Sequence, residues 1–129
     1  MAQYVALAQQ GYGPADFRLA LMTWSRNHPG DRAQAVQSLQ QGADAGDPYC
    51  HRRLAELYER GEAVDADLAQ ALIHHLIAER LFARNGADAD AEIARYRAAS
   101  LARNMPPQEA VAAAREAMTW LSDRAPAPH

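Results

Sequence analysis

The chain has 129 residues, of which 49% are hydrophobic, enough for one domain with a continuous core. Its formal net charge of −3 argues against nucleic-acid binding, because no basic surplus exists to displace counterions from phosphates. The single cysteine excludes an internal disulfide and favours a reducing compartment. No signal-peptide pattern or membrane-length apolar run occurs, so we expect a soluble, cytoplasmic protein without a membrane role.

Thirty alanines and the absence of strand-type alternation predict an all-α protein. The first three predicted helices cover residues 2–10, 14–26 and 31–45. Gly-Pro and Pro-Gly sequences separate them, as such dipeptides mark turns. Asp31 follows the second of these turns. We expect it to be the N-cap of the third helix, where its carboxylate would accept hydrogen bonds from free backbone N–H groups.

The remaining four predicted helices cover residues 48–60, 67–84, 89–103 and 107–123. Gly61 is expected to end the first of these in a left-handed conformation, and Asp67 to cap the second. Pro107 suits the first turn of the last helix, where its missing N–H would have no partner. Seven helices therefore form one domain over residues 1–124, and residues 125–129 form a flexible tail.

Two stretches of the chain repeat each other at a spacing of about 35 residues. The Arg-Leu-Ala sequence at 18–20 recurs at 53–55, and Gly11 aligns with Gly46. With one further residue of spacing, the Asp-Arg-Ala-Gln-Ala-Val sequence from Asp31 aligns with the Asp-Leu-Ala-Gln-Ala-Leu sequence from Asp67. A two-helix period of this length is typical of stacked helical repeats, whose units bury their apolar faces against neighbours.

This pattern resembles the Sel-one-like repeat, a relative of the tetratricopeptide repeat, most closely over residues 11–82. The second unit carries the matching residues Leu54-Ala55, Leu57-Tyr58, Gly61, Val64, Asp67, Gln70-Ala71 and Ala78. Ala63 departs from the family, which has a second turn glycine there. The resemblance implies a right-handed α/α superhelix (a solenoid) acting as a protein–protein interaction module, such as a small bacterial adaptor or scaffold.

Three residues invite a chemical interpretation. His74 and His75 suggest a metal site, but neighbouring side chains point about 100° apart on a helix and no third ligand is apparent. Because they occupy aromatic positions of the repeat, we interpret them as half-buried structural residues. Cys50 lies near a helix start and beside two arginines, which favours a reactive thiol, although the repeat register favours a small packing residue. We predict no catalytic site, cofactor or metal, and no enzyme activity.

The most informative difference between the two units is a helix stripe. Leu54, Leu57 and Tyr58 are predicted to be interior, and the opposite face of that helix is charged. At the equivalent positions of the first unit, the predicted helix at 14–26 is apolar. The residues of this surface are Phe17, Leu21 and Trp24, followed by Arg52, Glu56 and Glu59. Either the N-terminal helix or the curvature of the chain covers the apolar stripe, or the stripe is an exposed groove for a partner helix or a second copy of the chain.

We predict that these six residues bind another protein or peptide, with homodimer formation as one version. A narrower version is neutralisation of a cognate effector, which no residue selects. The alternative is a small-ligand-binding protein or an enzyme using the concave face near His51, Arg52 and Glu56.

Overall fold

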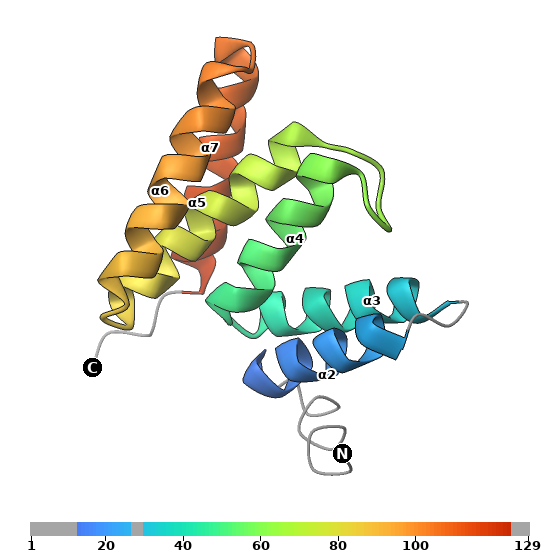
Figure 1. Cartoon of the computed structure of the whole chain (residues 1–129). Helices are drawn as coiled ribbons and strands as arrows, with labels where there is room; N and C mark the ends of the chain where they lie inside the picture. The colour runs from blue at the N-terminus through green and yellow to red at the C-terminus, as the bar shows by residue number, and fades with distance from the viewer. Residues whose placement is uncertain (1–12, 27–29, 125–129) are drawn as a thin grey trace.

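The computed structural model of the chain describes residues 13–26 and 30–124, and every regular element in these ranges is a helix (Figure 1). The helices are α2 (Gly13–Arg26), α3 (Asp31–Asp44), α4 (Pro48–Arg60), α5 (Leu68–Arg84), α6 (Asp88–Arg103) and α7 (Pro107–Asp123). The all-α prediction is confirmed. The described part holds six helices where the sequence predicted seven, because the first predicted helix, 2–10, lies outside the described residues. The predicted tail, 125–129, lies outside them as well.

Each helix from α2 to α5 packs against the next along the chain, and α5 is the central element of the second half. In Figure 1, α2 and α3 lie side by side at the lower edge, and α4 leads from them to α5. Helix α5 packs against α4, α6 and α7, whereas α6 and α7 contact each other only slightly. The α2–α3 pair therefore connects to the rest of the described structure mainly through α4.

Small residues make these helix crossings close. Ala35, Ala55, Ala71 and Ala78 are fully buried, consistent with the short side chain that allows two helix backbones to approach. Three apolar clusters result. One joins α2, α3 and α4, the second joins α5, α6 and α7, and the third lies between α5 and α6.

The predicted interior of α4 is largely confirmed. Leu54 and Leu57 are buried in the first cluster, with exposed fractions of 1% and 0%. Tyr58 is only half-buried and packs against the edge of the same cluster.

The helix ends follow the local signals, with one correction. Gly61 ends α4 with a φ of 68°, and the carboxylate of Asp67 accepts from the backbone N–H of Gln70 at 3.1 Å. The prediction that Asp31 is an N-cap is wrong. Gly30 is the N-cap of α3, with a φ of 81°. Glycine adopts that left-handed conformation without a steric penalty, so the helix begins one residue earlier than an N-cap at Asp31 would place it, and Asp31 lies buried in its first turn.

Candidate functional site

The apolar stripe on α2 is partly covered by the chain itself. Phe17 and Trp24 are half-buried and pack against the cluster that α2 shares with α3 and α4. Leu21, between them, is 41% exposed. The segment 2–10, which one interpretation places over the stripe, lies outside the described residues. Two of the three predicted residues thus serve the core, and Leu21 presents an apolar side chain at the surface.

A pocket of roughly 530 Å³ opens between α2 and the start of α4. We call it the α2–α4 pocket. Its apolar lining comes from Phe17, Leu21, Pro48 and Tyr49, and its polar lining from Arg18, Asp47 and Asn85. A cavity of this size lined by aromatic and aliphatic carbon with a few polar groups is typical of ligand and side-chain binding sites. The sequence pattern identified Phe17 and Leu21 of this lining. It missed the neighbouring Arg18 and the residues that lie far along the chain: Asp47, Pro48, Tyr49 and Asn85.

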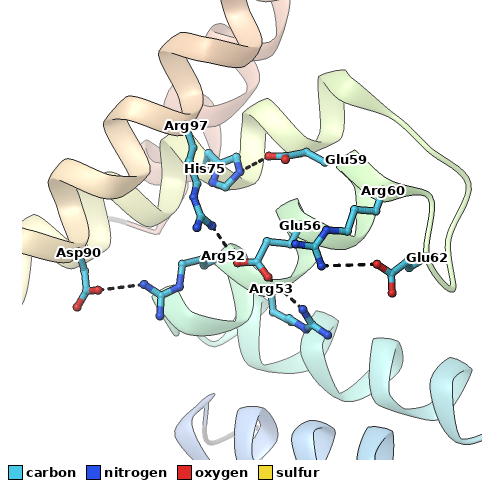
Figure 2. Close-up of polar contacts among 9 residues, drawn as sticks. All are labelled: Arg52, Arg53, Glu56, Glu59, Arg60, Glu62, His75, Asp90 and Arg97. Carbon is cyan, nitrogen blue, oxygen red and sulfur yellow. Dashed lines mark hydrogen bonds and ion pairs between the residues drawn. The ribbon is translucent and has the colours of Figure 1, made fainter. Parts of the chain in front are cut away.

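The charged half of the predicted surface is engaged within the protein, as Figure 2 shows. Arg52 donates to Asp90 of α6 at 3.0 Å. Glu59 accepts from the ring of His75 on α5 at 2.5 Å. These contacts join α4 to α5 and α6, so the residues both form a surface and hold three helices together.

Glu56 is the most heavily paired acid of this network. Its two carboxylate oxygens accept from Arg53 at 3.0 Å and from Arg97 of α6 at 2.9 Å. Burial alone would raise the pKa of Glu56, but the hydrogen bonds from these two arginines outweigh it and hold the pKa below its usual value. Glu56 is therefore ionised at neutral pH, and it links the surface of α4 to α6 (Figure 2).

The apolar and charged halves adjoin through one stack of side chains. The rings of Phe17 and Tyr49 lie 5.6 Å apart between centroids. The guanidinium of Arg52 lies 5.1 Å from the Tyr49 ring centroid and 5.3 Å from that of Phe82. Arginine stacked on aromatic faces at such distances is stabilised by cation–π attraction. The stripe on α2 and the charged face of α4 are thus in contact through Tyr49, which the sequence analysis did not single out.

Trp24 makes a second link of the same kind. The guanidinium groups of Arg32 and Arg53 lie 4.8 Å and 5.2 Å from its ring centroid. Arg53 also donates to Glu56, so a contact chain runs from α2 through Trp24 to the charged network. Arginine is the basic residue suited to this double role, because its planar group stacks on a ring while its edge donates hydrogen bonds.

The buried His51 and the half-buried His74 form a hydrogen-bonded pair that the sequence did not predict. Nε2 of His51 donates to the carbonyl oxygen of Ala43 at 2.9 Å, which leaves Nδ1 of His51 to accept from Nδ1 of His74, also at 2.9 Å. His74 stacks on Tyr58 with the rings 5° from parallel, and Trp120 meets His51 edge-on. The partners are 23 residues apart, so no local signal in the sequence could have paired them.

Both rings of this pair are neutral at physiological pH. Burial, followed by the nearby His74, lowers the pKa of His51 to about 3. Burial, followed by the nearby His75, lowers the pKa of His74 to about 4. These rings serve the packing of α4 and α5, as the structural interpretation of His74 expects. His51 is 1% exposed, so it is not offered to solvent at a concave face.

His75 and Cys50 are also interior. His75 is fully buried, and among the described residues its Nδ1 has no hydrogen-bond partner. The thiol of Cys50 is buried and donates to the carboxylate of Asp47 at 3.3 Å. Burial raises the pKa of Asp47 against the lowering effect of its hydrogen bonds from Cys50 and Tyr49. Cys50 is therefore the small packing residue that the repeat register predicted.

Within residues 13–26 and 30–124, no three His, Cys, Asp or Glu side chains come together in a way that could hold a metal ion. Over the same ranges, no helix combines the length and apolar character needed to cross a bilayer. Comparison of the chain with protein-family models, with curated proteins and with solved structures gives no match.

Proposed function

We propose that this chain is a protein–protein interaction module, a small helical-repeat adaptor that binds a partner protein or peptide through the face shared by α2 and α4. Under this proposal its hairpins stack as a right-handed superhelix of the Sel-one-like kind. The partner-binding residues are those predicted from the sequence: Phe17, Leu21, Trp24, Arg52, Glu56 and Glu59.

The observation that carries the proposal is the α2–α4 pocket. The exposed Leu21 lies at its edge, and Arg52 stacks on Tyr49, one of its lining residues. Leu21 is one of the exposed large apolar residues of the described chain, and it lies beside a cavity lined by two aromatic rings. Interface energy concentrates where an apolar side chain of one partner fills such a cavity on the other, surrounded by polar groups that exclude water.

The six residues have different roles in this proposal. Leu21, with the edges of Phe17 and Trp24, supplies the apolar contact. Arg52, Glu56 and Glu59 already have intramolecular partners, so they act as a charged rim and fix the relative position of α4, α5 and α6. Rim charges of this kind steer a partner and set its orientation more than they add affinity.

The alternative of a small-ligand site or an active site near His51, Arg52 and Glu56 has less support. His51 is buried with both ring nitrogens hydrogen-bonded, and Glu56 is paired with two arginines. None of the three is positioned as a free acid, base or nucleophile. A second copy of the chain as the partner is a version of the proposal and is distinguished in its test.

The test uses the tagged chain to capture proteins from a native lysate, with two matched variants. Leu21→Glu places a charge at the exposed leucine, and Met118→Glu does the same on α7, where Met118 is 53% exposed. We expect captured proteins to be retained by the wild type and by Met118→Glu, and lost with Leu21→Glu. Light scattering on the purified chain detects self-association, which should be lost with the same variant. Capture that survives Leu21→Glu unchanged would contradict the proposal.

A further inference from the structure

The charge around the α2–α4 pocket is unevenly compensated. Arg18 lines the pocket and is exposed, and no carboxylate among the described residues forms an ion pair with it. Asp47 is the acid of the lining. Its Oδ1 accepts from the backbone N–H of Tyr49 at 3.2 Å and its Oδ2 from the thiol of Cys50 at 3.3 Å. The pocket therefore presents a cation to an incoming group, whereas its carboxylate is occupied.

Arginines also outnumber their carboxylate partners farther along the α2 stripe, beside Trp24. Arg32 is exposed and stacks on Trp24 without a carboxylate partner in the described ranges. Arg53 stacks on the same ring and shares one carboxylate, that of Glu56, with Arg97. The protein as a whole carries a net charge of −3, so this basic region stands against an acidic background.

We propose that the α2–α4 pocket accepts an apolar side chain from an acidic amphipathic helix of the partner protein. This inference rests on the proposed function and names the chemistry of the partner. An apolar stripe on the partner helix packs along Phe17, Leu21 and Trp24, which repeat at the i, i+4, i+7 spacing of one helix face. Carboxylates flanking that stripe approach Arg18 and Arg32.

The geometry explains why both features of the partner are needed. The apolar side chain gains most of its binding free energy by leaving water for a cavity lined by Phe17 and Tyr49. The flanking carboxylates add attraction to arginines that lack an ion-pair partner in the described structure and so need not break a pair to bind. A basic helix would place its charges against the same arginines, and like charges at an interface select against a partner.

The experiment uses three labelled synthetic helices of equal length and measures their binding by fluorescence anisotropy. The first has a leucine stripe flanked by glutamates, the second has the same stripe flanked by lysines, and the third has the glutamates with serines in place of the leucines. We expect the first to bind at least about tenfold more tightly than either of the others, a difference of about 1.4 kcal/mol, and its advantage over the lysine helix to shrink at high salt.

Two charge-reversal variants locate the effect. Arg18→Glu should weaken binding of the glutamate helix by about tenfold and strengthen binding of the lysine helix. Arg115→Glu, an exposed residue of α7, should leave both unchanged. Circular dichroism checks that each variant keeps its helix content.

The inference is overturned if the acidic and basic helices bind equally, if none of the three binds, or if Arg18→Glu has no effect. The proposed function fails separately, since it depends on the loss of captured proteins with Leu21→Glu. Capture that is lost with Leu21→Glu and unaffected by Arg18→Glu would leave an interaction module whose partner is not an acidic helix.

Discussion

Ala63 has the most unusual backbone conformation among the described residues other than glycine. Its φ is 61°, in the left-handed region, where the Cβ atom of an L-residue crowds the following carbonyl oxygen. The residue lies in the connection between α4 and α5, at the position where the repeat that the chain resembles has a glycine. Ala63 therefore carries a steric cost that a glycine at this position would avoid.

We expect Ala63→Gly to raise the free energy of unfolding by about 0.5–1 kcal/mol. Glycine removes the backbone strain, and the larger conformational entropy of the unfolded glycine chain offsets part of that stabilisation. Urea titration measures the change. Ala99→Gly, at an exposed position inside α6, is the matched control and should cost about 1 kcal/mol through lost helix propensity. A loss of stability with Ala63→Gly would show that the left-handed conformation at this position is wrong.

The hydrogen-bonded pair of His51 and His74 makes stability depend on pH. In the unfolded chain each ring binds a proton near pH 6.5, whereas in the folded protein the pKa values are lowered to about 3 and about 4. Below pH 6.5 the unfolded state therefore binds more protons than the folded state, and acidification favours unfolding. The stability contributed by the neutral rings is present at neutral pH. It is lost progressively as the pH falls from 6.5 to about 4 for His74 and to about 3 for His51.

We expect the free energy of unfolding to fall by on the order of 2–4 kcal/mol between pH 7 and pH 5, up to about 1.4 kcal/mol per pH unit for each ring. Denaturant unfolding at a series of pH values measures the slope. Nuclear magnetic resonance of the imidazole protons assigns it to these rings, which should not titrate above pH 5 in the folded protein. A ring of this pair that titrates near pH 6.5 would contradict the buried arrangement.

At the scale of single elements, α4 is the helix that the rest of the described structure depends on. One side of it carries Leu54 and Leu57 into the core. The other side carries Arg52, Glu56 and Glu59, which bind residues of α5 and α6. Its neighbour α2 stacks on it through aromatic and arginine side chains. Changes within α4 should therefore affect stability first, and changes at its boundary with α2 should affect binding first.

Leu54→Ala tests the first half of that expectation. Leu54 is fully interior, so removing its side chain forfeits burial and leaves a cavity, and we expect a loss of about 2–5 kcal/mol in the free energy of unfolding. Leu68→Ala, at the exposed start of α5, is the control and should cost less than about 1 kcal/mol. Equal effects of the two substitutions would show that the register of α4 is wrong.

At the scale of the whole molecule, local signals predicted the helices well because each depends on a few neighbouring residues. Asp67, Gly61 and Pro107 start or stop helices through contacts within one turn, and they act as expected. The N-cap of α3 is Gly30, where the sequence predicted Asp31. Two adjacent residues were each suited to precede the helix, and the glycine adopts the left-handed conformation found at that position.

The candidate site was only partly predictable, because its geometry depends on contacts between distant segments. The repeat register identified the stripe of α2 and the charged face of α4. It could not pair Arg52 with Asp90 or His51 with His74, since these contacts depend on how α4 meets α5 and α6. It also missed Tyr49, whose role arises from lying between Phe17 and Arg52 in space.

Under the proposed function, a partner protein binds the face shared by α2 and α4. Hydrogen–deuterium exchange, measured on the chain alone and with the captured partner, tests it most directly. We expect slower exchange on binding in Gly13–Arg26 and in Pro48–Arg60, with little change in Pro107–Asp123. Protection confined to α6 and α7, with exchange in α2 and α4 unchanged, would contradict it.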